Sequence, residues 1–258
     1  MLKSADRFGI IAVPTGTVVI VAGIANKRYN GMIKEDTYTG FLSALVAGHK
    51  AECVEIFEGL VTEGDSFISI YEDLIRRAMY DVGLMWESNR ISVATEHLAA
   101  AIAEHLMGRL YDRIAPQIGA AGTVVVACPQ RELHQIGARM VSDVFENNGW
   151  NTVFAGANVP LADLLRLLDE SRPHFCALSL SLYMNLPGFL ATTESIRSKF
   201  PSIPVLVGGQ AFQRVGSLSN FPAGIIHCPS LRILDDFLKR YVSPPERLAP
   251  ELKKEHRS

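Results

Sequence analysis

The chain has 258 residues, of which 48% are hydrophobic, and it carries a formal net charge of -2. One domain usually spans about 100 to 200 residues, so this length predicts two domains, each with its own core. The weak net charge provides no basic field for direct DNA or RNA binding. The four cysteines are scattered without paired spacing. They indicate reduced thiols in a cytoplasmic protein, not a disulfide frame or a zinc site.

Residues 1–35 form an N-terminal arm to which the sequence assigns no role. Its apolar run, from Phe8 to Ala25, is interrupted by Pro14 and Gly16. A transmembrane helix needs about 20 uninterrupted apolar residues. We therefore expect two short strands or an extended arm, and no membrane association.

Residues 36–114 have a helical pattern throughout. Apolar side chains recur at helical spacing in four segments, which are separated at Gly48, at Gly64 and at a turn before Ser92. Ser66 and Ser92 are placed to cap the third and fourth helices. Four helices with short connections predict an up-and-down bundle.

Residues 115–122 contain a proline and two glycines and are predicted to be the interdomain linker. Strands and helices then alternate over residues 123–242. The predicted strands are 123–128, 151–155, 174–180, 204–207 and a short one at 225–226; the predicted helices are about 136–148, 161–171, 188–199 and 231–241. The fold class is therefore α/β, with an N-terminal four-helix bundle cap followed by a Rossmann-like (flavodoxin-like) parallel-sheet domain. Residues 243–258 are expected to be a mobile tail.

The segment from Thr123 to Gly137 contains the candidate site around which the chain is organised. It predicts a strand, then a loop, then the hexapeptide Glu132-Leu133-His134-Gln135-Ile136-Gly137. Ligands of open α/β sheets bind at the carboxyl ends of strands, so His134 is a candidate metal ligand. Glu132 is placed to accept the N–H of the other ring nitrogen, which would fix the tautomer. The alternative is an ordinary loop histidine.

Two further elements follow the ends of later strands, namely Ser179-Leu180-Ser181 and Gly208-Gly209. With the hexapeptide, their order and spacing resemble the D-x-H-x-x-G, S-x-L and G-G pattern of cobalamin-binding domains. The resemblance implies that His134 binds cobalt from below, in place of the cofactor's own base. It also implies that the displaced base meets Ser179 and that its tail passes the two glycines. The other cofactor-binding residues it implies are Glu132, Leu133, Gly137 and Ser181.

These residue types suit that role. Imidazole is a good cobalt ligand, a hydroxyl group can bind a base nitrogen, and glycine lets a bulky tail approach the backbone. The chain departs from the pattern twice, since Glu132 replaces Asp and Ser181 replaces Leu. Neither change removes a group that the chemistry needs.

In the predicted bundle, Trp86 is followed after nine residues by Glu96-His97. This spacing matches the W-x9-E-H signature of the adenosylcobalamin photoreceptors that control carotenoid genes, a family that the chain resembles from about residue 36 to 240. Val93, Glu96 and His97 share one helix face. The resemblance implies that they and Trp86 cover the upper 5′-deoxyadenosyl group. The alternative is that Trp86 belongs to the bundle core and that Glu96-His97 is a solvated pair.

Two features differ from those photoreceptors. Their DNA-binding helix-turn-helix has no counterpart in residues 1–35, so we expect no direct DNA binding. Glu87 follows the tryptophan where those sensors carry a histidine that binds cobalt after photolysis. The upper ligand in the light would then be His49, His97 or water.

The resemblance therefore implies a light sensor and not an enzyme. By the resemblance, light breaks the cobalt–carbon bond, and the cap or the oligomeric state changes and signals to a protein partner. Relatives without the DNA-binding part include sensors that also carry a bilin, for which the N-terminal arm leaves room. The alternatives are a methyl-carrying corrinoid protein of a methyltransferase system, an adenosylcobalamin mutase subunit, and a flavodoxin-like protein without cobalamin.

Overall fold

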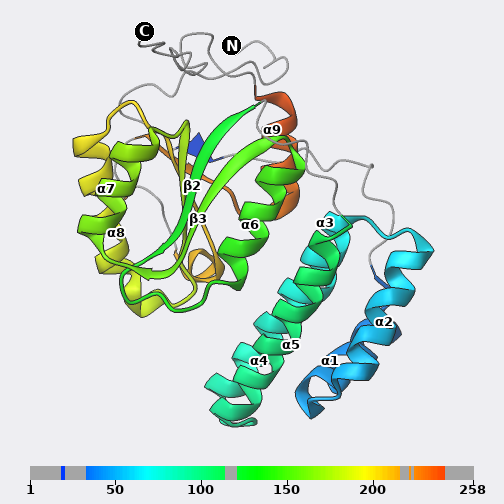
Figure 1. Cartoon of the computed structure of the whole chain (residues 1–258). Coiled ribbons are helices and arrows are strands. Elements are labelled where there is room, and N and C mark those ends of the chain that lie inside the picture. Colours follow the sequence, from blue (N-terminus) through cyan, green and yellow to red (C-terminus); the bar gives the residue numbers. More distant parts are fainter. Residues whose placement is uncertain (1–18, 21–32, 114–120, 216–220, 222–223, 242–258) are drawn as a thin grey trace, which may run out of the picture.

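The computed structural model describes residues 19–20, 33–113, 121–215, 221 and 224–241. A helical cap is followed by an α/β domain with a parallel sheet, so the predicted fold class is confirmed (Figure 1). Most of the N-terminal arm, most of the linker and the C-terminal tail lie outside the described residues. Within the described ranges, no helix combines the length and apolar character needed to cross a membrane.

Four helical segments build the cap. They are α1 (Glu35–Ala47), α2 (Lys50–Glu63), a composite helix and α5 (Val93–Tyr111). The composite helix runs through α3 (Phe67–Ser69), a π-helix (Ile70–Arg76) and α4 (Arg77–Glu87). Gly48 and Gly64 end α1 and α2 in the left-handed conformation, with φ of 73° and 87°, which glycine adopts without strain. Ser66 and Ser92 cap α3 and α5 by accepting the backbone N–H three residues on.

The sheet has six parallel strands in the order β1-β6-β5-β4-β2-β3. In chain order they are β1 (Val19–Ile20), β2 (Gly122–Pro129), β3 (Trp150–Val159), β4 (Phe175–Ser179), β5 (Val205–Gly208) and β6 (Ile225–His227). β2 starts at Gly122, a residue that the sequence pattern assigns to the linker. β3 is longer than predicted and continues through Gly156 and Asn158, which take positive φ where the register with β2 shifts.

Four helices cover the sheet, with α7 (Leu161–Ser171) and α8 (Leu186–Lys199) on one face and α6 (Ile136–Asn147) and α9 (Leu231–Arg240) on the other (Figure 1). Side chains of β2 alternate between the faces as the strand pleat requires. Val124 and Val126 pack with α6 and α9, whereas Val125 and Ala127 pack with α7 and α8.

The described part of the predicted arm joins the α/β domain. Val19 and Ile20 pair in parallel with Ile226 and His227 and so form an edge of the sheet. This agrees with the prediction of short strands over residues 8–25, although the sequence does not predict a pairing partner. The rest of that segment lies outside the described residues.

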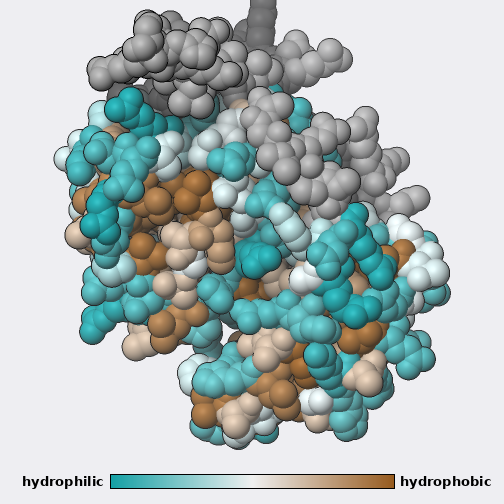
Figure 2. All heavy atoms as spheres, viewed as in Figure 1, coloured by the Kyte–Doolittle hydropathy of each residue, from teal (hydrophilic) through white to brown (hydrophobic). Residues whose placement is uncertain are grey.

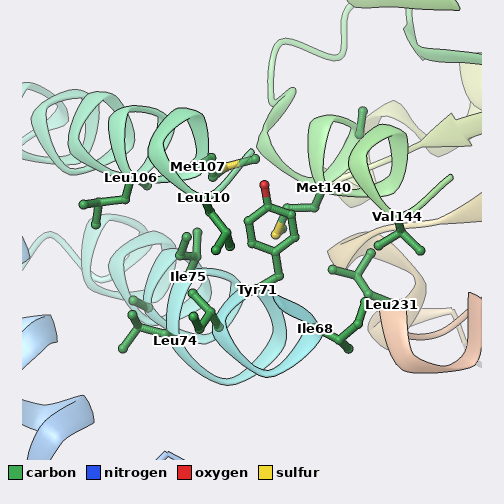
Figure 3. Close-up of a cluster of buried hydrophobic side chains, with 14 of the residues drawn as sticks. Ile68, Tyr71, Leu74, Ile75, Leu106, Met107, Leu110, Met140, Val144 and Leu231 are labelled. Atoms are coloured by element: carbon green, nitrogen blue, oxygen red, sulfur yellow. The ribbon is translucent and has the colours of Figure 1, made fainter. Parts of the chain in front are cut away.

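The cap and the α6–α9 face of the sheet share one hydrophobic core. Figure 3 shows Tyr71 at its centre, surrounded by side chains of its own helix and of α5, α6 and α9, among them Leu110, Met140 and Leu231. The Tyr71 hydroxyl donates a hydrogen bond of 2.6 Å to Asp143 Oδ2 on α6. The α3 end of the composite helix is therefore fixed to the α/β domain.

The opposite end of the cap is less well covered. Hydrophobic side chains reach the surface where α4 ends and α5 begins, at Leu84, Trp86, Val93 and Leu98. Figure 2 shows hydrophobic residues among hydrophilic ones at this lower end of the cap. The Tyr71 end of the cap is thus buried against the α/β domain, whereas the end near Trp86 leaves hydrophobic side chains exposed.

Candidate functional site

A cavity of about 560 Å³ lies between the cap and the carboxyl edge of the sheet. This is the edge at which α/β proteins bind ligands, and the volume is in the range of small-molecule sites. Of the twelve predicted site residues, eleven line it: Trp86, Val93, Glu96, His97, Leu133, His134, Gly137, Ser179, Ser181, Gly208 and Gly209. The twelfth, Glu132, lies behind the wall.

Glu132 holds His134 in one orientation. Its Oε1 lies 2.6 Å from His134 Nδ1 and 3.0 Å from the His134 backbone nitrogen. Its Oε2 accepts the backbone N–H groups of Ser181 and Leu182 at 3.0 and 3.1 Å. An acceptor with this many donors is a carboxylate, so Nδ1 carries a proton and donates it. Nε2 is then left as the nitrogen through which the ring can bind a metal.

The electrostatics of the pair follow from these bonds. Burial favours the neutral form of Glu132, but the hydrogen bonds from His134, Leu182 and Ser181 outweigh it and lower its pKa. The hydrogen bond to Glu132 raises the pKa of His134, against the smaller effect of burial. Glu132 therefore acts as a buried anion that orients the imidazole and joins the loop after β2 to the loop after β4.

The glycines of the site are needed by the fold itself. Gly209 has φ of 113°, and a Cβ there would overlap the carbonyl oxygen of Leu180. A Cβ on Gly208 would lie 2.9 Å from the carbonyl oxygen of Cys228. The sequence suggests that these glycines admit a ligand tail. The structure adds that the loops after β4, β5 and β6 meet at this point and leave no room for side chains.

The cavity also extends inward from Ser179, which is buried at the end of β4. There it is lined by Val126, Ala177 and Leu206 of the sheet, facing Met140 of α6 and Leu234 of α9. This apolar recess runs between the sheet and the two helices.

The cap forms the opposite wall. Trp86, Val93, Glu96 and His97 all line the cavity, so α4 and α5 bring together the residues that the sequence predicts to share a surface. Trp86 is 39% exposed, so it is not a buried core residue of the bundle, as the first part of the alternative would require. The Glu96 side chain is 17% exposed and that of His97 is 75%, with 3.6 Å between Oε2 and Nε2. Of these two, only His97 is well solvated.

Glu87 lines the cavity as well, but it is engaged elsewhere. Its Oε2 lies 2.8 Å from Nη2 of Arg214, so an exposed ion pair joins the end of α4 to the short helix Gln210–Arg214 of the α/β domain. His49 lies away from the cavity lining, exposed on the loop between α1 and α2 beside Glu52. Of the two candidate histidines for an upper ligand, His97 alone lines the cavity.

Sequence reasoning missed a polar part of the cap wall. Glu72, Arg76 and Tyr80 line the cavity from the composite helix. Their spacing of four residues places them on one helix face, which is not the apolar face whose periodicity predicts this helix. Burial raises the pKa of Glu72, in part against the attraction of Arg76.

Two protein-family models, both described as a B12 binding domain, match this chain. One covers residues 38–111, which are the cap, and the other covers residues 122–224, which include β2 to β5. Each match includes residues of one wall of the cavity, and residues 228–234 of the lining lie beyond both.

Among curated proteins, the chain is 30% identical to the HTH-type transcriptional repressors CarA, over 120 residues, and CarH, over 146 residues, both of Myxococcus xanthus. The matches cover 46% and 56% of this chain, but the chain spans less than half of either relative, 41% and 48%. Among solved structures, the monomethylamine corrinoid protein of Methanosarcina barkeri superposes with a TM-score of 0.69 at 15% identity. It covers 81% of this chain and 100% of its own, which shows a shared fold.

The residues present fit a corrinoid. His134 offers one nitrogen, which is what a metal needs from the protein when a macrocycle supplies the ring of equatorial ligands. The apolar recess beyond Ser179 offers a place for the base and its tail. The cap wall provides an aromatic face and directed polar groups above the imidazole.

Proposed function

We propose that this chain, which is built from the two B12-binding domains, is a light sensor that binds adenosylcobalamin and signals to a protein partner. The observation that carries the proposal is the composition of the cap wall. Trp86, Glu96 and His97 line the cavity that His134 enters from the opposite side. A large aromatic ring beside a carboxylate and an imidazole suits a nucleoside group and exceeds what a methyl group requires.

His134 would hold the cobalt from below, with Glu132 fixing its tautomer, while Ser179 and the recess beyond it would receive the displaced base. When bound, adenosylcobalamin supplies a cobalt–carbon bond that visible light breaks. Trp86, Val93, Glu96 and His97 would cover the adenosyl group in the dark. Once that group has left, these side chains lose their contacts, and the relative stability of cap positions changes.

The light signal would reach a protein partner as a change in the conformation of the cap or in the oligomeric state. The cap is fixed at the Tyr71 end and held by an exposed ion pair near Trp86. A movement that opens the Trp86 end would expose Leu84 and Val93 further, and these are side chains that a partner surface or a second copy could cover.

The alternative is a methyl-carrying corrinoid protein that serves a methyltransferase. It is favoured by the superposition of the whole monomethylamine corrinoid protein on this chain. Glu96 and His97 argue against the methyl carrier, because a methyl group offers neither side chain a hydrogen-bond partner.

The test is an absorption spectrum of the protein loaded in the dark with adenosylcobalamin, before and after green light, with size-exclusion chromatography of both samples. The sensor should be stable in the dark and should change both its spectrum and its elution after light. Preferred binding of methylcobalamin, with no change in elution, would favour the methyl carrier.

A pair of variants tests the ligand assignment within the same experiment. His134→Ala should fold and lose the spectrum of protein-nitrogen ligation, because alanine supplies no nitrogen. His49→Ala is the matched control, since His49 is exposed and away from the cavity lining, and its spectrum should equal that of the parent. An unchanged spectrum of His134→Ala would remove His134 from the site.

A further inference from the structure

A glycine lies among large side chains in the cap wall of the cavity. Gly83 belongs to α4, four residues before that helix ends at Glu87, and it lines the cavity. The residues three and four positions away on either side, Met79, Tyr80, Trp86 and Glu87, line the cavity as well. Residues at this spacing share one face of a helix. A side chain at position 83 would therefore point into the cavity.

The fold itself does not require this glycine. Within a helix, glycine is less favourable than every other residue except proline. Gly83 lies in a regular α-helix, so no left-handed conformation calls for it. A Cβ atom on Gly83 would meet no described atom within 4 Å beyond its chain neighbours and its own helix backbone. Gly209 differs in both respects, because its φ is positive and its Cβ would overlap Leu180.

The space that Gly83 leaves open belongs to the cavity. It lies one helical turn from Trp86, the aromatic ring proposed to cover the upper group of the cofactor. A methyl group needs no such space, whereas a nucleoside is larger than any side chain of the wall. A glycine that weakens the helix and leaves room beside Trp86 is explained by a bulky group that occupies this room.

We propose that Gly83 determines the size of the upper group that the protein accepts, by leaving room for the nucleoside of adenosylcobalamin. This inference rests on the binding of adenosylcobalamin in the proposed function, but not on the response to light. Trp86 then provides a contact surface and Gly83 provides the space beside it. A larger residue at position 83 would restrict the site to cobalamins with a small upper group.

The first test measures dissociation constants for adenosylcobalamin and methylcobalamin in the dark, by absorption titration of the parent and of Gly83→Leu. The variant should bind adenosylcobalamin about tenfold or more weakly than the parent does, because the leucine side chain occupies the space of the nucleoside. Its affinity for methylcobalamin should stay within about threefold of the parent value, because a single carbon on cobalt does not need that space.

The matched control is Gly59, which lies four residues before the end of α2, is exposed and lines neither cavity. A Cβ there would also have open space. Gly59→Leu should bind both cobalamins within about twofold of the parent. A second measurement separates the ligand from the fold. In the ligand-free protein, Gly83→Ala and Gly59→Ala should each raise the melting temperature by about 1 to 4 °C, because alanine favours the helix.

The proposal is overturned if Gly83→Leu binds adenosylcobalamin as the parent does, or if it weakens both cobalamins equally. A Gly83→Ala protein that melts below the parent would also overturn it, because the glycine would then serve the fold. A parent that binds no adenosylcobalamin would overturn it together with the proposed function. A parent that responds to light while Gly83→Leu keeps its affinity would contradict only this inference. Loss of adenosylcobalamin selectivity in Gly83→Leu, with no light response in the parent, would support it and contradict only the light sensor.

Discussion

Shortening Glu132 by one methylene should break the link that it makes between two loops. In Glu132→Asp the carboxylate retreats by about 1.5 Å, the length of one C–C bond. The wild-type side chain reaches His134 with one oxygen and the backbone of Ser181 and Leu182 with the other. An aspartate can keep the local contact with the residue two positions on, as in an Asx turn, but it cannot span to the second loop.

The expected loss is about 2 kcal/mol in the free energy of unfolding, because two hydrogen bonds are lost and each bond to a charged acceptor contributes about 1.5 to 3 kcal/mol when fully buried. Ser181 and Leu182 are only partly buried, so water replaces part of what the carboxylate provided. The orientation of His134 should be retained, because its bonds to residue 132 are local.

The assay is urea unfolding followed by circular dichroism and tryptophan fluorescence. Glu170→Asp is the matched control, since Glu170 is exposed on α7, and it should change the unfolding free energy by less than about 0.5 kcal/mol. A Glu132→Asp protein as stable as this control would refute the reasoning. So would a variant that loses histidine ligation while keeping full stability.

Three further changes test other parts of the structure. Trp86→Ala should reduce the preference for adenosylcobalamin over methylcobalamin, and an equal ratio of the two dissociation constants in variant and parent would argue against the cap assignment. Gly209→Ala should destabilise by about 2 to 4 kcal/mol in urea unfolding, from positive φ and overlap with Leu180 in the loop after β4, whereas Gly188→Ala, with open space at Cβ, should not destabilise. Burial raises the pKa of Asp143 to about 6. The native state therefore holds a proton that the unfolded chain releases, and this stabilisation is complete below about pH 4 and lost as pH rises to about 6. The stability of the parent relative to Asp143→Asn should fall by about 1 to 3 kcal/mol between these pH values, and a constant difference would contradict the shift.

The features that could be predicted from sequence are those that depend on neighbours along the chain. Helix ends follow from Gly48, Gly64, Ser66 and Ser92, which act on their own turn. The contact between Glu132 and His134 spans two residues. The common surface of Val93, Glu96 and His97 follows from helical spacing alone.

The features that escaped prediction depend on distant parts of the chain. The bonds from Glu132 to the loop after β4 join residues 49 and 50 positions apart, and Glu72 meets α9 across 159 positions. The pairing of Val19 with Ile226 joins residues that are still further apart in the sequence. The π-helix from Ile70 to Arg76 was not predicted either, because an apolar periodicity of about 3.6 residues indicates an ordinary α-helix.

The way the cap is held determines which of its ends the proposed loss of the upper group could move. Near α3, Tyr71 is buried in the shared core and bonded to Asp143, and the Arg232 side chain pairs with Asp73. Near the end of α4, the described contacts across the cavity include the exposed pair of Glu87 and Arg214, a kind of contact worth about 0 to 1 kcal/mol.

The composite helix runs about 15 residues from Tyr71 to Trp86, or about 22 Å at helical rise. A small rotation about the buried end therefore becomes a large displacement at the exposed end. The groups proposed to cover the upper ligand, Trp86, Glu96 and His97, lie at that exposed end. A ligand contact worth about 1 to 2 kcal/mol there would shift the equilibrium between cap positions about 5- to 30-fold, so the proposed loss of the upper group would bias the cap towards opening.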